Sequence, residues 1–313
     1  MTLVLLCALL AGCTAAPPDS VMRSDADKST LISADTSALT PDTLQATLYF
    51  RYGSTEYLAP EMRPVTVQRN ETAEKALVQA LINGPAATSS SLSPLFPPGT
   101  EVLAVTSQEN TLFVTFSETL LGRYSDEPVD VSVEPWKTEL PLRRHLCMDA
   151  LTATLTEAGL CSQVQVLVYR SNAQSSSMRL QAGFFDRGVD ETLLPPLTRN
   201  EDRLLTPHNT VAALLKDWMN QNWPALYGWV SRDTRPGEQT AVNSFAAGRI
   251  ITGFEVSAGT VSIDGQSAVL CADLTMRAAG EDEALAGYPV HLTREDGIWR
   301  IDYDPLMALM QNQ

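Results

Sequence analysis

The sequence predicts an α+β protein with two folded domains, and three observations lead to this prediction. Runs in which apolar residues recur every three or four positions, typical of helices, are interspersed with runs in which apolar and polar residues alternate, typical of strands. A charged, proline-containing stretch, residues 184–205, separates two segments of domain size, 45–183 and 206–304. The chain has 313 residues, 44% of them hydrophobic, which is enough for two cores.

The N-terminus begins with a short apolar run, residues 3–10, which leads into Leu10-Ala11-Gly12-Cys13. The run is too short for a transmembrane helix, which needs about 20 apolar residues. Small residues before a cysteine indicate a lipoprotein signal peptide, residues 1–12, followed by acylation of Cys13. We therefore expect a lipid anchor on the outer face of the bacterial cytoplasmic membrane. The alternative is an ordinary secretory signal with a chance cysteine.

Residues 13–44 are rich in Ser, Thr, Asp, Ala and Pro and show no sustained period, which predicts a flexible tether. Strands are expected at residues 46–52 and 62–68. A helix should follow, with Asn70 as its N-cap and Gly84-Pro85 as its stop. Asn70-Glu71-Thr72 also matches a glycosylation sequon, but capping is the preferred interpretation. The apolar stripe of this helix consists of Ala73, Ala76, Leu77, Ala80 and Leu81.

The second half of this segment combines a hairpin, a helix and further strands. A turn at residues 95–100 leads into alternating runs at 101–107 and 111–117, which predict a β-hairpin. A second helix is expected over residues 141–158, ending at Gly159. A strand at 164–169 and a short return at 178–182 complete the segment. The stripe of the second helix consists of Leu142, Leu146, Cys147, Ala150, Leu151 and Leu155.

In this order, the pieces resemble the GerMN domain of sporulation and spore-germination lipoproteins, over residues 45–183. The residues that carry the resemblance are Leu48-Tyr49-Phe50, Ala80-Leu81-Ile82-Asn83-Gly84-Pro85, Phe96-Pro97-Pro98-Gly99-Thr100, residues 112–117, and Leu151-Thr152 ahead of residues 164–168. Two departures stand out: residues 123–140 bear little likeness, and Arg170-Ser171-Asn172 replace the usual glycines. The resemblance implies two helices packed on a small mixed sheet, similar to ring-building motifs of secretion systems. It also implies a scaffold role in the sporulation envelope and no catalytic residues.

The segment 206–304 reads as helices followed by an antiparallel sheet. Thr206 is a predicted N-cap with Pro207 at the first helical position, and the pattern breaks at Asn222-Trp223-Pro224. Tight turns are expected at Asp264-Gly265 and Asp296-Gly297. This order resembles a small NTF2-like domain with a curved sheet, and residues 305–313 are expected to be a tail. The predicted strands cover residues 250–256, 260–263, 268–276, 288–293 and 298–303.

Three polar residues of the second domain could face a common ligand pocket: Asp273, His291 and Arg300. In a catalytic version His291 would be the general base and Asp273 its orienting partner. We prefer the alternative that both side chains are simply exposed on strands. Four tryptophans at residues 218, 223, 229 and 299 could form a sugar-binding platform, but core positions are the preferred interpretation.

Arg143, Arg144 and His145 form the one local cluster of basic residues in an acidic sequence. They are a candidate docking site for an acidic face of a protein partner. The alternative is the solvated side of the second helix. The cysteines other than Cys7 and Cys13 are expected to be small buried hydrophobic residues, not a disulfide or metal framework: Cys147, Cys161 and Cys271.

Composition and motifs exclude several classes of function. The net charge of −15 argues against nucleic-acid binding. No Cys-x-x-Cys, His-Glu-x-x-His, Gly-x-Ser-x-Gly or phosphate-binding glycine loop occurs, so neither a metal nor a cofactor is expected. The sequence therefore predicts a non-catalytic, lipid-anchored scaffold or interaction protein of the envelope, with protein partners and a possible homo-oligomer. The alternative is a lipoprotein that binds a cell-wall fragment or small molecule in an NTF2-like pocket.

Overall fold

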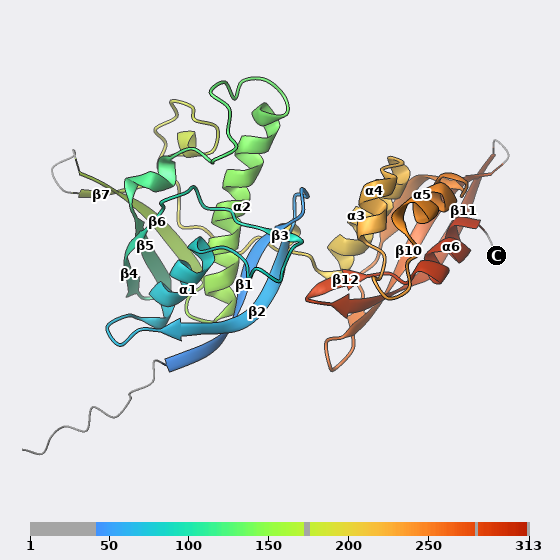
Figure 1. The fold of residues 1–313 in the computed structure, drawn as a ribbon, viewed down its shortest axis with the longest axis horizontal. Helices are drawn as coiled ribbons and strands as arrows, with labels where there is room; N and C mark the ends of the chain where they lie inside the picture. Colours follow the sequence, from blue (N-terminus) through green and yellow to red (C-terminus); the bar gives the residue numbers. More distant parts are fainter. Residues whose placement is uncertain (1–41, 172–175, 279–280, 312–313) are drawn as a thin grey trace, which may run out of the picture. The chain divides into compact units, whose positions relative to one another are not determined.

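A computed structural model describes residues 42–171, 176–278 and 281–311 (Figure 1). The expected signal peptide, Cys13 and nearly all of the expected tether lie outside the described residues. Residues 42–44, the end of that tether, instead belong to the first strand. None of the helices in the described ranges has the length and apolar content needed to cross a membrane. The described residues form the predicted α+β fold, with two hydrophobic cores.

The first sheet is three-stranded and antiparallel, in the order β2-β1-β3. β1 (Asp42–Tyr52) and β2 (Leu58–Val67) each begin four residues before the predicted start. They do so because the two strands pair along their whole length, from Asp42 opposite Val67 to Arg51 opposite Leu58. β3 (Leu92–Ser93) was not predicted, since two residues carry no detectable alternation.

The second sheet is four-stranded and mixed, in the order β4-β5-β6-β7. β4 (Val102–Gln108) and β5 (Thr111–Phe116) form the predicted hairpin, with Gln108 opposite Thr111. β6 (Gln163–Arg170) pairs parallel to β5, and β7 (Ser176–Arg179) returns antiparallel along β6. A parallel pair needs a crossover connection, which the second helix supplies here. The expected single mixed sheet is therefore accompanied by a separate antiparallel one.

Both helices of the first domain form, but each differs from the prediction at its start. α1 (Ala73–Ile82) is capped by Thr72, whose side chain accepts a hydrogen bond from the Lys75 amide, and not by Asn70. α2 (Trp136–Glu157) begins five residues before the predicted start and contains Pro141. Pro141 is the sixth residue of this helix, beyond the first turn, and the helix continues through it with the loss of one backbone hydrogen bond.

α2 lies between the two sheets and contacts β1 on one side and β6 on the other (Figure 1). Its buried residues, among them Leu146, Leu151 and Leu155, form much of the first core. The stretch expected as a linker also packs on this core, because it contains apolar residues on both sides of Pro195-Pro196. Leu197 bridges Val164 of β6.

The second domain places three helices before its sheet, as expected for the helix-first order. They are α3 (Pro207–Met219), α4 (Trp223–Gly228) and α5 (Glu238–Ala246). The predicted cap is confirmed, since the Thr206 side chain accepts a hydrogen bond from the Asn209 amide at 3.1 Å. α5 was not predicted, and α6 (Tyr303–Gln311) occupies most of the expected tail.

The sheet of this domain is antiparallel, in the order β12-β11-β10-β8, with β9 paired to β10. A register shift between Ala272 and Leu274 interrupts the pairing of β10 with β11, and such bulges increase local bending. α3 packs on β8 and β10. The strands are β8 (Ile250–Val256), β9 (Thr260–Val261), β10 (Ser267–Ala278), β11 (Glu281–Glu295) and β12 (Ile298–Arg300).

Trp218, Trp229 and Trp299 are buried in the second core, so the core interpretation is confirmed for these three. The expectation for the cysteines holds in part. Cys147 and Cys161 are buried free thiols, but Cys271 is exposed, and its expected burial is wrong. The alternation of β10 explains this, because Cys271 lies between the inward-facing Leu270 and Ala272 and therefore points away from the core.

Candidate functional site

The structure does not bring Asp273, His291 and Arg300 into one pocket. Asp273 is exposed at the bulge of β10, where its carboxylate accepts a hydrogen bond from the Gly287 amide. His291 is also exposed, opposite Val269. Arg300 is buried and pairs with Glu295 at 3.2 Å. The described geometry therefore gives these residues no shared ligand.

The three basic residues of α2 point in different directions. Arg143 lies over the rings of Tyr124 and Trp136. Arg144 is only 2% exposed, and the ring of His145 stacks on Phe185 at a centroid distance of 3.8 Å. The interpretation of the three as one solvated face is wrong for Arg144, because consecutive helical residues are about 100° apart around the axis.

Arg143 belongs to a network of paired charges at the start of α2. It donates two hydrogen bonds to Asp126, at 2.7 and 3.0 Å, and one to Glu139 at 3.3 Å. These hydrogen bonds lower the pKa of Asp126. Glu139 also pairs with Arg51 of β1. A hollow of about 580 Å³ lies beside this network. The charged groups of this network pair with one another. They therefore hold the loop before α2 in place and are not free to bind a ligand.

Arg144 and Arg187 form a clamp around the loop that follows β5. The Arg144 guanidinium donates to the carbonyls of Gly122 and Phe184 and lies 4.6 Å from the centre of the Phe184 ring. Arg187 donates to the Gly122 carbonyl at 2.9 Å and forms a two-pronged ion pair with Glu127. Burial lowers the pKa of Arg144, and the positive charge of Arg187 adds to that effect. Two arginines therefore share one set of backbone acceptors.

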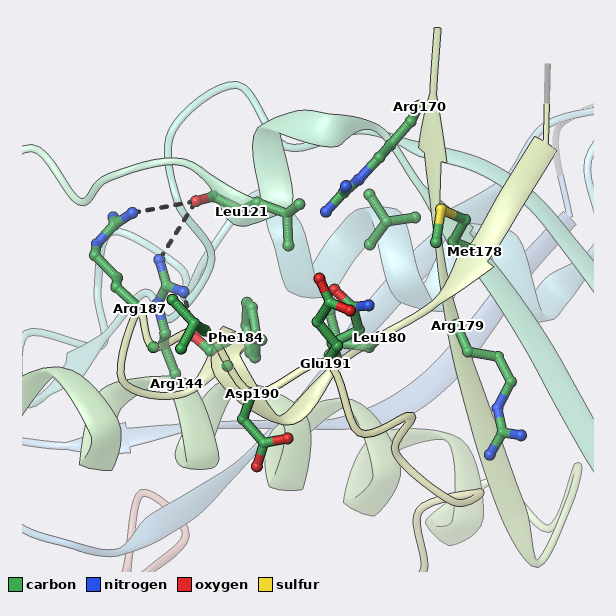
Figure 2. A pocket seen from close by; sticks show the side chains of 15 residues that line it. Leu121, Arg144, Arg170, Met178, Arg179, Leu180, Phe184, Arg187, Asp190 and Glu191 are labelled. Atoms are coloured by element: carbon green, nitrogen blue, oxygen red, sulfur yellow. Dashed lines mark hydrogen bonds between the residues drawn. The ribbon is translucent and has the colours of Figure 1, made fainter. Parts of the chain in front are cut away.

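A cavity of about 370 Å³ opens beside this clamp, between β6, β7 and residues 180–191 (Figure 2). Its walls combine charged residues with apolar ones, and the apolar residues include Leu121, Val168, Met178 and Phe184. Arg144 and Arg187 border it, and Figure 2 shows both donating to the Leu121 carbonyl. The cavity thus has a rigid side formed by the clamp.

Two of the charged residues around the cavity point into it, and two others point away. Figure 2 shows the Arg170 guanidinium and the Glu191 carboxylate directed toward the interior, whereas Arg179 and Asp190 are directed outward. Arg179 donates to the Leu194 carbonyl, and Asp190 accepts from the Thr192 amide at 2.9 Å. Within the described ranges, neither Arg170 nor Glu191 has a side-chain hydrogen bond or ion pair.

Sequence reasoning did not select Arg170 or Glu191. The one available signal was Arg170 itself, which stands where the resembled family usually has glycine. Glu191 gave no signal, because its approach to β6 depends on how residues 180–197 fold back. Among the described residues, no three His, Cys, Asp or Glu side chains are grouped to hold an ion.

Comparison with known proteins confirms the resemblance of the first domain. Residues 47–169 match the family model described as Germane, sporulation and spore germination. No curated protein matches the chain. The tandem GerMN domains of the sporulation protein GerM from Bacillus subtilis are 19% identical, with a TM-score of 0.32, over 54% of this chain and 50% of that one. The first GerMN domain alone is 13% identical, with a TM-score of 0.32, over 51% and 99%.

An NTF2-like protein is also among the similar solved structures. An NTF2-like protein from Cytophaga hutchinsonii is 17% identical, with a TM-score of 0.23, over 33% of this chain and 95% of that one. At such identities and scores, these likenesses say nothing about ligands or partners. The comparisons therefore show a family-model match over residues 47–169.

Proposed function

We propose that this chain, whose residues 47–169 match the sporulation and spore germination family, is a non-catalytic, lipid-anchored scaffold protein of the bacterial envelope. Cys13 is the proposed anchor, on the outer face of the cytoplasmic membrane. The family match is the observation that carries the proposal. The scaffold would act in sporulation or germination by self-association and by binding protein partners.

The surface of the first domain supports a role in protein binding. Val129, Val133 and Val189 are 86%, 57% and 98% exposed, although valine is usually buried. They lie on two loops that the Arg187–Glu127 ion pair holds together. We propose that these loops, which carry the three exposed valines, form the contact surface of the scaffold.

The alternative, a ligand pocket in the second domain, has less support. Its three candidate residues comprise two exposed side chains and one buried, ion-paired arginine. A ligand would need these groups to converge, and the described geometry keeps them apart.

The anchor can be tested by labelling cells with radioactive palmitate. Wild type should incorporate label, Cys13→Ala should not, and the matched variant Cys7→Ala should still be labelled, because residue 7 lies in the cleaved segment. Two acyl chains are needed for firm attachment, so Cys13→Ala should also move to the soluble fraction. Equal labelling of wild type and Cys13→Ala would show that Cys13 is not the anchor.

The scaffold role can be tested with a photo-crosslinking residue placed at Val189 in cells. We expect cross-links between copies of the chain. The control position is Ile263, which is also fully exposed but lies in the turn region between β9 and β10. Cross-links that form equally at both positions, or at neither, would contradict a specific contact surface on the first domain.

A further inference from the structure

We propose that the cavity between β6, β7 and residues 180–191 is a binding site for a small α-amino acid. Arg170 would hold the carboxylate of the ligand and Glu191 its ammonium group, while the apolar wall would receive its side chain. This site is formed by the first domain together with residues 184–191, and its assignment does not depend on the scaffold role.

The first observation is the state of Arg170. It is the last residue of β6, it is half-buried, and its guanidinium points into the cavity (Figure 2). The neighbouring cations have partners: Arg187 pairs with Glu127, and Arg179 donates to a backbone carbonyl. Among the described residues, Arg170 alone of these three has no acceptor. A guanidinium presents parallel N–H donors that match a carboxylate, so the free group selects such a ligand.

The second observation is the opposite charge on the other side of the same space. The Glu191 carboxylate is directed into the cavity in Figure 2, and no ion pair joins it to Arg170. A ligand with only a negative charge would be repelled by Glu191, and one with only a positive charge by Arg170. A molecule that carries both charges a few ångströms apart satisfies both residues. An α-amino acid is the simplest such molecule.

The third observation is the group of apolar side chains that line the same cavity. Leu121, Val168 and Met178 line the cavity together with Phe184. The volume of about 370 Å³ lies near the lower end of ligand pockets, which span roughly 300–1,000 Å³. It suits a ligand of amino-acid size with an apolar side chain. The flexible Met178 side chain can adjust to different shapes.

The walls are held in place before any ligand binds. The clamp of Arg144 and Arg187 fixes Leu121 and Gly122 against residues 184–187. The β6–β7 pairing, with Arg170 opposite Ser176, fixes the other side. Binding to a preformed cavity loses less conformational entropy than binding to a mobile one. The site therefore needs no large rearrangement.

Calorimetric titration of the full chain, purified in detergent, tests the proposal with three probes. L-leucine carries both charges, N-acetyl-L-leucine lacks the ammonium group, and L-leucinamide lacks the carboxylate. We expect leucine to bind and each analogue to bind at least roughly tenfold more weakly, since a charge-assisted contact is lost. This comparison uses the unaltered protein, so it does not depend on the folding of any variant.

Four variants then assign the contacts. Arg170→Gln and Glu191→Gln should each weaken leucine binding by roughly tenfold. Glu191→Gln should also remove the preference for leucine over N-acetyl-L-leucine. Arg170→Gln should remove the preference for leucine over L-leucinamide. The matched controls Arg179→Gln and Asp190→Asn change the same charges on the same segments, but their side chains point outward, so they should bind leucine like wild type.

Three results would overturn the assignment. The first is no binding of leucine at millimolar concentration, which would leave the cavity without an amino-acid ligand. The second is binding of N-acetyl-L-leucine as tight as that of leucine, which would remove any role for Glu191. The third is a loss of binding in Arg179→Gln as large as in Arg170→Gln, which would reduce the effect to net charge.

Discussion

Asp149 on α2 should make the first domain less stable at pH values above about 6, and its replacement by asparagine should reverse this. Burial raises the pKa of Asp149 to about 6, although Arg203 and a 3.4 Å hydrogen bond from Asn200 act in the opposite direction. The reference value for aspartate is 3.8. The folded protein therefore holds the proton of Asp149 more tightly than the unfolded chain does.

The sign and size of the effect follow from this difference. A raised carboxyl pKa contributes stability that is fully present below the unfolded pKa of 3.8, and it is lost as pH rises through about 6. About two pKa units correspond to about 3 kcal/mol, which is an upper limit because the group keeps some contact with water. Asparagine resembles the protonated acid. We therefore expect Asp149→Asn to be about 2–3 kcal/mol more stable than wild type at pH 7.5, and equal to it near pH 4.

Urea denaturation of wild type and Asp149→Asn at pH 4, 5, 6 and 7.5 measures this difference directly. Other carboxylates titrate in both proteins, so they cancel when the free energies of unfolding are subtracted. Asp126→Asn is the matched control with the opposite sign, because Arg143 lowers the pKa of Asp126, and removing that charge should cost stability above pH 4. The reasoning is refuted if Asp149→Asn gives no gain at pH 7.5, or a gain of the same size at every pH.

Two further predictions follow from burial. Arg144→Met should lower the free energy of unfolding by about 2 kcal/mol or more, because hydrogen bonds from a charged donor to buried carbonyls are lost. Arg143→Met should lower it by about 1 kcal/mol or less. Urea denaturation compares the two variants, and equal losses would contradict the different burial of the two residues. In native protein at pH 8, iodoacetamide should modify Cys271 rapidly and leave Cys147 intact, because burial raises the pKa of the Cys147 thiol and blocks access of the reagent. Peptide mass spectrometry measures the modification of each cysteine. Early modification of Cys147 would contradict the prediction.

The order of secondary structure in the first domain could be predicted because each signal was local. The β4–β5 hairpin follows from two alternating runs joined by three polar residues, and the end of α2 follows from Gly159, whose backbone φ is +69°. The start of α2 could not be found in the same way. Pro141 looked like a helix start, but tertiary packing between two sheets stabilises a helix that extends beyond it.

The secondary structure of the second domain is harder to predict, because several of its elements lack a strong hydrophobic pattern in the sequence. α5 has only Ala241 and Phe245 buried, which is too few apolar positions to mark a helix in the sequence. α6 was taken for a tail, yet Leu306, Met307, Leu309 and Met310 pack into the second core. Such short amphipathic helices depend on the sheet they cover more than on their own propensity.

The candidate site was the least predictable part. Arg143 and Arg144 are adjacent in sequence, but Arg143 pairs with the exposed carboxylate of Asp126, whereas Arg144 is buried against backbone carbonyls, and only the fold distinguishes them. Arg170 and Glu191 are separated by 20 intervening positions and meet because residues 180–197 turn back along β6. The bridge between Gln181 and Leu193 that produces this turn joins residues with no recognisable strand pattern.

Native mass spectrometry of residues 41–313 tests the central proposal, self-association of the scaffold, most directly. We expect a discrete oligomer at micromolar concentration, and a shift toward monomer when Val129 and Val189 are both replaced by lysine, since a charge at the centre of a contact surface opposes association. An oligomer that persists in the double variant would move the contact surface elsewhere. A monomer at every concentration, for wild type as well as the variant, would contradict the self-assembling scaffold.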